Sequence, residues 1–438
     1  MRWMSCTPDG FTICPGRVAD LVREFAQFGA LPGGGVSRLC ASLADGRARD
    51  RLGELLQEAG AEISVDAVGN QFGLFQLLDD RDVLSGGPPV MIGSHLDSQP
   101  RGGRIDGTLG VMAALEIGRL LLAAKQAGQR FQRNFCVVNW TNEEGARFRP
   151  SLLGSGVFAG HYAEAFALAC QDDAGDTLED ALVAIGYRGT DKAPPIPEFY
   201  MELHAEQGPR LEAAGRQIGL VTRNWGAAKL DLVFEGEQAH TGPTPMAERR
   251  DALLAASRAI DAVRRLADNA KTVVHTSVGR LVVSPNSSNV VPDRVEFTAE
   301  IRSPDDDILM EAEDTIQQKL DELAKSTGVV LHRPSRSIRL ARAMPDTMVN
   351  FLAGCSAALG KPTMPIDTVA GHDALSLIGL CQTALVFVPS IGGIAHNEAE
   401  ATDDVDIDAG TSVLLEAAFR LCGGETPGSM SHQTQGPS

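Results

Sequence analysis

Helix-like and strand-like patterns of hydrophobic positions alternate along most of the chain. Residues 17–28 and 50–59 carry apolar side chains at helical spacing, which predicts two amphipathic helices. Residues 90–92 and 135–139 are short apolar runs bounded by turn residues, a pattern typical of buried parallel strands. A helix predicted over 108–127 separates these runs, so we expect a strand–helix–strand unit here.

The pattern changes near residue 221. A half-exposed strand is predicted at 229–235, and the elements after it follow in the order helix, strand, strand, helix, at residues 250–267, 272–283, 295–301 and 307–325. This order is typical of a small open sheet with helices on one face, as in ferredoxin-like α+β domains. We therefore expect an α/β fold, with a mixed, largely parallel sheet flanked by helices and an inserted α+β domain.

The chain of 438 residues is too long for one ordinary hydrophobic core, which favours two domains. The first is expected to form from residues 1–221 and to resume at 336–422, on either side of an insert at 222–335. The end of the chain, 423–438, is rich in Gly, Ser, Pro and Gln and is expected to be disordered.

Composition narrows the class of protein. A hydrophobic content of 43% with 22% charged residues is typical of a globular protein, and the net charge of −18 argues against nucleic acid and anionic membrane surfaces as partners. No apolar run approaches the length of a membrane span, and residues 1–14 lack the apolar segment of a secretory signal. The eight cysteines form no CxxC pair, which favours free thiols in a reducing, cytoplasmic setting.

Several apolar runs end in residues that could bind metal. His95 and Asp97 follow the run at 90–92, at the carboxyl end of a predicted strand, where open α/β sheets collect their ligands. In extended chain these two side chains would point to one side. This spacing suits a carboxylate that orients the imidazole and fixes its tautomer.

Three carboxylates also lie where metal ions could bind. Asp106 lies among glycines that lead into a predicted helix, and a carboxylate in such an uncrowded turn can approach two metal ions, although Asp-Gly is also a common turn. Glu143 and Glu144 are adjacent at the end of an apolar strand, a costly place for two negative charges without cations. We interpret one of them as a metal ligand and the other as a proton-transfer group.

Two histidines complete the set. His204 lies in MELHAEQGP and His396 in LVFVPSIGGIAHNEAE, and each taken singly would more often be structural. Five such segments in one chain favour a metal site. Two divalent cations bring about +4, and two carboxylates with a hydroxide bring about −3, so three neutral imidazoles can complete the shell. We therefore predict two divalent ions as cofactors, zinc first, with manganese, cobalt or nickel as alternatives.

Five long motifs point to one family: GSHLDSQPRGGRIDGTLGV, TNEEGARFRPSLLGSGVFAG, HAEQGPRLE, HTGPTPMAERRDA and NVVPDRVEFTAEIR. Together they resemble the hydantoinase/carbamoylase branch of the zinc-peptidase superfamily. Its members include N-carbamoyl-L-amino acid hydrolases, β-ureidopropionases and allantoate amidohydrolases. The resemblance implies a zinc-exopeptidase-like fold, with the insert acting as a lid and dimerisation domain.

The resemblance also implies roles for individual residues. One metal ion would be held by His95, Asp106 and His204, and the other by Asp106, Glu144 and His396, with Asp106 bridging. Glu143 would be the general base and acid, and His240 would stabilise the oxyanion from the partner subunit of a homodimer. Asp97, the carboxylate expected to orient His95, is counted with these catalytic residues. The residues that would bind a small substrate with a free carboxylate are Gln207, Asn289, Arg302 and Gly371, with Arg302 gripping the carboxylate.

The expected reaction is hydrolysis of a linear amide. The first candidate substrate is an N-carbamoyl-L-amino acid or N-carbamoyl-β-alanine, giving the amino acid, ammonia and carbon dioxide. Alternatives are an allantoate amidohydrolase, an N-acyl-amino-acid amidase, and a non-catalytic metal-binding homologue, which would have lost Glu143 or a ligand. Thr368 and Val369 stand where relatives usually carry a Ser-Gly pair, and Ala395 and Asn397 flank His396 where relatives usually show serine and then proline.

Overall fold

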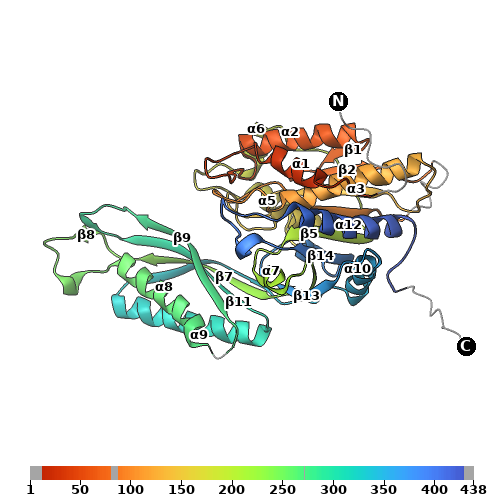
Figure 1. Ribbon diagram of the computed structural model, residues 1–438. Helices are drawn as coiled ribbons and strands as arrows, with labels where there is room; N and C mark the ends of the chain where they lie inside the picture. Colours follow the sequence, from red (N-terminus) through yellow and green to blue (C-terminus); the bar gives the residue numbers. More distant parts are fainter. Residues whose placement is uncertain (1–11, 80–86, 271, 429–438) are drawn as a thin grey trace, which may run out of the picture. The chain divides into compact units, whose positions relative to one another are not determined.

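The computed structural model describes residues 12–79, 87–270 and 272–428. The chain forms two compact units (Figure 1). Unit 1 runs to Thr222 and resumes at Met344, and unit 2 is Arg223–Ala343. The insert expected at 222–335 begins at nearly the same place. Its expected end falls inside a strand, Val330–Arg339, that belongs to the sheet of unit 2.

Unit 1 is built on an eight-stranded sheet. The strands, in their order across the sheet, are β1 (Glu62–Val65), β2 (Gln71–Phe75), β4 (Phe135–Trp140), β3 (Val90–His95), β5 (Phe199–Ala205), β14 (Gln382–Val388), β6 (Ile218–Asn224) and β13 (Thr363–Thr368). The four central strands, β4, β3, β5 and β14, run parallel, while β2 and β6 run antiparallel to their neighbours in this group. The sheet is therefore mixed and largely parallel, as expected.

Helices cover both faces of this sheet. One face carries α1 (Arg17–Phe25), α2 (Leu43–Glu58), α3 (Thr108–Gln126), α10 (Asp346–Ala358) and α12 (Asp404–Cys422). The other face carries α11 (Asp373–Leu377), which packs against α4 (Leu153–Phe158). The remaining short helices of unit 1 are α5 (Glu164–Leu168), α6 (Leu178–Ala184), α7 (Arg210–Ala214) and the 3-10 turn η2 (Ile391–Gly393).

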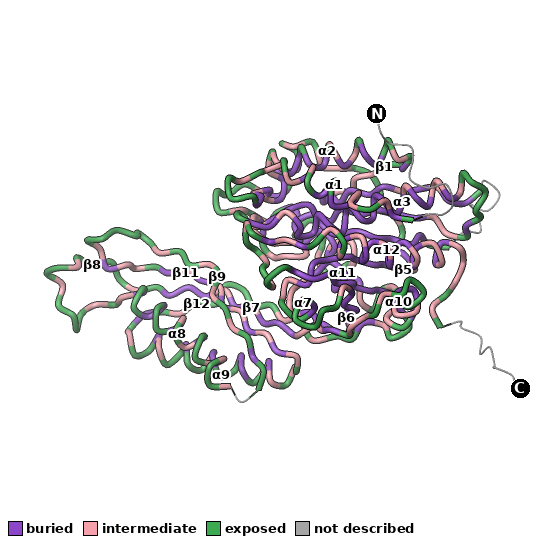
Figure 2. Tube along the Cα trace, in the orientation of Figure 1, coloured by how far each residue is buried: buried purple, intermediate pink, exposed green. Residues whose placement is uncertain are grey.

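Burial on both faces of the sheet explains why these strands could be predicted from the sequence. Along β3, Val90 and Ile92 pack into the core beneath α3 and α12, while Met91 packs into the core on the opposite face. A strand buried on both sides reads as a continuous apolar run. The runs predicted at 90–92 and 135–139 are therefore β3 and β4, and the helix predicted between them is α3. Every residue of β3 and β4 is buried, and Figure 2 shows the interior of unit 1, around the labelled strand β5, as largely buried.

Unit 2 has the β-α-β-β-α-β order of a ferredoxin-like domain. Its elements are β7 (Gly226–Glu235), α8 (Ala252–Asn269), β9 (His275–Ser284), β11 (Arg294–Ser303), α9 (Asp306–Thr327) and β12 (Val330–Arg339), with the short β8 (Ala239–His240), η1 (Met246–Glu248) and β10 (Val290–Val291). The antiparallel sheet has the order β12-β7-β11-β9. Both long helices pack on one face, where Leu230, Phe234 and Phe297 form the core with Leu309 and Leu320.

Two further expectations from the sequence concern membrane crossing and the C-terminal tail. Within the described residues, no helix combines the length and the apolar character that a membrane crossing requires. Helix α12 ends at Cys422, and turns follow as far as residue 428. The rest of the tail expected to be disordered, 429–438, lies outside the described residues.

Candidate metal centre

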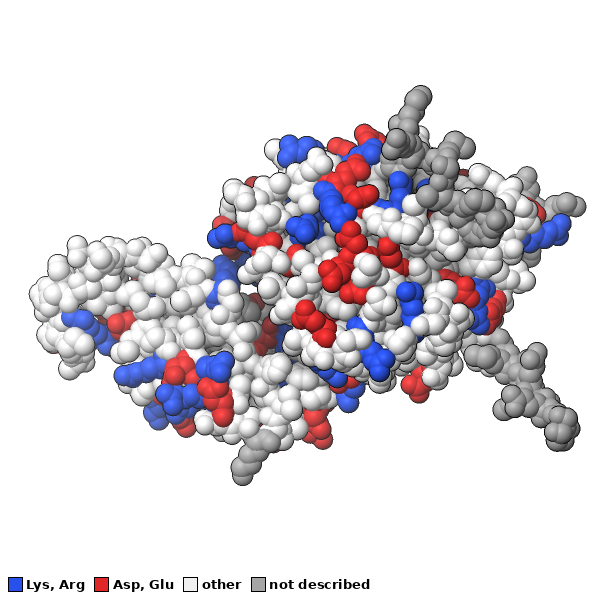
Figure 3. All heavy atoms as spheres, in the orientation of Figure 1, with Lys and Arg blue, Asp and Glu red and all other residues white. Residues whose placement is uncertain are grey.

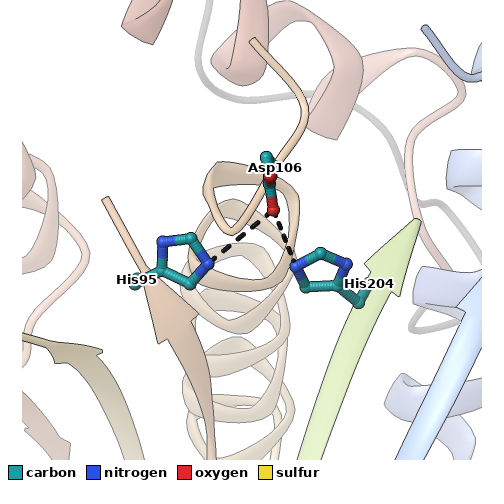
Figure 4. Close-up of side chains that lie close together, drawn as sticks. All are labelled: His95, Asp106 and His204. Atoms are coloured by element: carbon teal, nitrogen blue, oxygen red, sulfur yellow. Dashed lines mark ion pairs between the residues drawn. The ribbon is translucent and has the colours of Figure 1, made fainter. Parts of the chain in front are cut away.

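The candidate ligands gather at one edge of the central sheet of unit 1. Strand β3 ends at His95, β5 carries His204 one residue before its end, and β4 ends just before Glu143 and Glu144. Because β4, β3 and β5 are parallel neighbours, their carboxyl ends meet at the same edge. Asp106 lies in the turn that leads into α3, and Figure 4 shows its carboxylate directed between the rings of His95 and His204.

One group of three could hold a metal ion. Asp106 Oδ1 lies 3.1 Å from His204 Nε2 and 3.8 Å from His95 Nε2, and all three side chains are buried. Atoms that share one ion at about 2.0–2.1 Å each lie about 3–4 Å apart. The spacing of this group therefore fits a single ion.

A second group shares Asp106. Its other oxygen, Oδ2, lies 3.4 Å from His396 Nε2, and the same nitrogen lies 3.4 Å from Glu144 Oε2. Glu144 Oε1 is buried with no hydrogen-bond partner among the described residues, a cost that a cation would remove. Imidazole nitrogens mixed with carboxylate oxygens are the ligands that zinc and its transition-metal neighbours prefer.

The electrostatics of the cluster also call for cations. Burial, with the negative charge of Asp106 added, raises the pKa of Glu144 to about 8, and burial beside Asp373 and Glu144 raises the pKa of Glu143 well above its usual value. Burial would lower the pKa of His204, but contact with Asp106 outweighs it and raises that pKa to about 9. Bound divalent ions would favour the charged carboxylates and the neutral imidazole instead, and would therefore lower the pKa of all three groups.

Asp97 supports the cluster differently from the sequence-based expectation. His95 Nδ1 is 2.8 Å from the backbone carbonyl oxygen of Asp97 and 3.8 Å from its carboxylate Oδ1. The carboxylate instead accepts the backbone N–H groups of Glu143 and Glu144, at 3.2 and 3.3 Å. The expectation assumed extended chain, but β3 ends at His95, so the carbonyl fixes the ring and leaves Nε2 for a metal.

Glu143 and Gln207 border the two groups. Glu143 Oε2 lies 3.6 Å from His95 Nε2, and Glu143 belongs to neither ligand group. Gln207 Nε2 donates a hydrogen bond to Asp106 Oδ2 at 3.0 Å. Gln207 therefore lies beside the shared carboxylate, and Glu143 lies beside His95. The roles of base and substrate-binding amide that the resemblance implies for them stay predictions.

Sequence reasoning did not identify three residues that hold this cluster. Gln99 donates to Glu144 Oε2 at 2.7 Å. The buried guanidinium of Arg38 donates to the Leu96 carbonyl at 2.5 Å and to Thr108 Oγ1 at 2.7 Å, linking the segments that follow His95 and Asp106. Gly107 has φ +62, and a Cβ there would lie 2.4 Å from the His95 ring. Gln99 and Gly107 lie within the motif that carries His95 and Asp106, which was the only signal available for them.

A third group, Glu202, His204 and His372, also has the spacing of metal ligands. The Glu202 carboxylate, however, accepts hydrogen bonds from Ser94 Oγ at 2.7 Å and from the Ala374 backbone at 2.8 Å. The His372 ring packs 4.5 Å from the His204 ring. These contacts favour a buried network that fixes His204. Gly371, expected to bind substrate, directly precedes His372 at the start of α11.

The other expected site residues belong to unit 2. His240 is exposed on β8 and pairs with Val290 of β10, and the backbone N–H of the next residue, Thr241, donates to the Asn289 carbonyl at 3.2 Å. His240 and Asn289 are therefore neighbours in the short two-stranded sheet that β8 and β10 form. Arg302 lies on β11, with Nη2 2.9 Å from Glu300 Oε1.

An α/β sheet with a cluster of histidines and carboxylates at its carboxyl edge is the arrangement of a metal-dependent hydrolase. Comparison with known proteins agrees. The model of the peptidase family M20/M25/M40 matches residues 91–420. An N-carbamoyl-L-amino-acid amidohydrolase from Rhizobium meliloti is 37% identical, covering 92% of this chain and 95% of its own length. An allantoate amidohydrolase from Bacillus subtilis is 30% identical, covering 92% and 97%.

The solved structures agree with the sequences. An amidase of the hydantoinase/carbamoylase family from Burkholderia vietnamiensis superimposes with a TM-score of 0.89 at 38% identity, over 94% of this chain and 98% of that one. The chain belongs to the peptidase family M20/M25/M40, in its amidohydrolase branch of hydantoinase/carbamoylase type. The resemblance stated from the five motifs is thereby confirmed.

Proposed function

We propose that this protein hydrolyses the carbamoyl group of an N-carbamoyl-L-amino acid, or of N-carbamoyl-β-alanine, at a centre of two metal ions. The observation that carries the proposal is the position of Asp106, whose two carboxylate oxygens each face a different ligand group. The relatives named N-carbamoyl-L-amino-acid amidohydrolases support the choice of substrate.

His95, Asp106 and His204 would hold one ion, and Asp106, Glu144 and His396 the other, with zinc the first expectation and manganese, cobalt or nickel the alternatives. Bound ions supply Lewis acidity, which polarises a carbonyl and lowers the pKa of water toward neutrality. Glu143 takes a proton from the attacking water and passes it to the leaving nitrogen, a contribution of about 10²–10⁴ in rate. The carbamate released in this way would decompose to ammonia and carbon dioxide.

The family resemblance also assigns the substrate contacts. The planar guanidinium of Arg302 would bind the substrate carboxylate through two parallel hydrogen bonds, and Asn289, Gln207 and Gly371 would complete the binding site. The His240 imidazole would donate to the oxyanion. One such donor contributes about 3–4 kcal/mol to the transition state.

We propose that His240 acts in the site of a partner subunit. Strand β9 is an edge strand ten residues long, and its Leu281 and Val282 side chains are 47% and 42% exposed. Figure 3 shows few charged side chains around β8 and β9 on the visible face, while charges gather near α8 and α9. A long edge strand that exposes apolar side chains is a ready surface for pairing with a second copy.

A substrate panel tests the reaction. The protein is reconstituted with zinc, manganese or cobalt and assayed for ammonia release from N-carbamoyl-L-amino acids, N-carbamoyl-β-alanine and allantoate. We expect turnover of the carbamoyl substrates, and loss of that turnover after chelation with recovery when metal is restored. Turnover of allantoate alone would refute the substrate and favour the function named for the Bacillus subtilis relative.

A mixed-subunit experiment tests the shared site. His240→Ala and Glu143→Gln chains, each inactive alone, are co-expressed with different tags. If His240 acts across the dimer, each heterodimer contains one intact site, and random assembly restores about a quarter of wild-type activity. Co-expression of Glu143→Gln with Asp106→Ala is the matched control, because both changes lie in unit 1 and no heterodimer has an intact site. Equal activity in the two mixtures would refute the shared site.

A further inference from the structure

Glu400 is a buried carboxylate of this cluster that belongs to neither ligand group. Its exposed fraction is 1%. Oε2 accepts a hydrogen bond from the backbone N–H of His396 at 3.1 Å, and Oε1 is buried with no hydrogen-bond partner among the described residues. Burying a carboxylate with one oxygen unsatisfied is costly, so its place beside a metal ligand requires a reason.

The backbone of His396 supplies that reason. His396 has φ +50, in the left-handed region that side chains other than glycine adopt at a cost. Its side chain is 52% exposed, so packing does little to hold the ring in place. The Glu400 bond fixes the amide of His396, and the Glu400 N–H itself donates to the Asn397 carbonyl at 3.0 Å. The short turn from His396 to Glu400 is thus closed at both ends.

The loop that carries Asp106 is shaped to admit Glu400. A Cβ at Gly103 would lie 2.4 Å from Glu400 Cδ and 2.5 Å from its Cβ, so any side chain at position 103 would displace Glu400. Gly103 precedes Asp106 by three residues in the same loop. Glu400 therefore packs between the loop of the shared ligand, Asp106, and the turn of the exposed ligand, His396.

We propose that Glu400 is a positioning residue of the metal centre, which holds His396 in the strained backbone conformation that directs its ring toward Asp106 and Glu144. This inference rests on the proposed function, because it requires an ion bound by His396. Residues that orient a metal ligand typically contribute 10–100-fold to metal affinity.

Two conservative variants distinguish the length of the Glu400 side chain, which lets it reach His396, from its negative charge. Glu400→Gln keeps an oxygen that can accept the His396 N–H but loses the charge, whereas Glu400→Asp keeps the charge on a side chain too short to reach. We expect Glu400→Asp to weaken binding of one of the two ions at least tenfold, and Glu400→Gln to stay within about threefold of wild type. Glu398→Asp is the matched control, since Glu398 lies in the same turn but pairs with Arg101.

The readout is metal binding by the full-length apoprotein, titrated against a chromophoric chelator, together with its melting temperature. His396→Ala should lose the same ion, and adding Glu400→Asp to His396→Ala should cause no further loss. A Glu400→Gln protein as weak as Glu400→Asp, unchanged affinity in Glu400→Asp, or further loss in the double variant would each overturn the proposal. If wild-type protein binds only one ion, the two-ion function fails first and the inference fails with it.

Discussion

Replacing Asp106 with alanine is expected to remove both metal ions and to lower hydrolysis by at least about 10⁴-fold. The reason is geometric. Oδ1 of this side chain faces His204 and His95, while Oδ2 faces His396, so each ligand group loses the member that it shares with the other. The measurement is metal content after exhaustive dialysis, followed by ammonia release from an N-carbamoyl-L-amino acid.

The fold should survive this change. Asp106 is one of several carboxylates crowded at the sheet edge, where the pKa of Glu144 is raised to about 8 by burial and by the charge of Asp106 itself. Removing that charge relieves this repulsion, but it also removes the contacts with His204 and His396 that hold the pKa of Asp106 well below its usual value, so the melting temperature of the apoprotein should fall while the protein still folds. Asp50→Ala is a suitable control, because Asp50 is an exposed partner of Tyr187. An Asp106→Ala protein that still binds two ions would contradict the bridging role.

Replacing Glu143 with glutamine is expected to lower kcat by about 10²–10⁴-fold while both ions stay bound. Glutamine has nearly the same shape but cannot take a proton from water. Glu143 belongs to neither ligand group, although its Oε2 lies 3.6 Å from His95 Nε2. Metal content, kcat and KM are measured on the same reconstituted sample.

The matched control for this prediction is Glu116→Gln. Glu116 is also buried in unit 1, but it lies on α3 and pairs with Arg119 and Arg17. Its replacement should lower stability and leave kcat within about threefold. A Glu143→Gln protein that keeps most of its activity with both ions bound would show that another group moves the proton.

Much of unit 1 could be predicted because its strands are buried on both faces. Such strands read as continuous apolar runs, and metal-type residues follow those runs directly at His95 and Glu143. Since parallel strands end at one edge, the sequence alone predicted that these side chains would meet. The long motifs supplied the assignment of individual ligands and the family.

Strand β12 shows the limit of such patterns. It lies at the edge of the unit 2 sheet, most of its residues are exposed, and Pro334 falls at the irregularity in its pairing with β7. A strand that buries few side chains leaves little hydrophobic alternation, so only its backbone pairing reveals it. For this reason the end of the insert was predicted at 335, inside the strand.

The sequence by itself therefore determined the kind of fold, the family and the side chains that could hold metal, because these depend on periodicity and residue type. Tertiary structure alone decided that the Asp97 carbonyl, rather than its carboxylate, meets His95. It also brought Glu400 to the His396 amide and the Arg38 guanidinium to the two ligand segments. Nothing in the sequence marks these residues as partners of one another. Only folding brings them to the distances at which they can act.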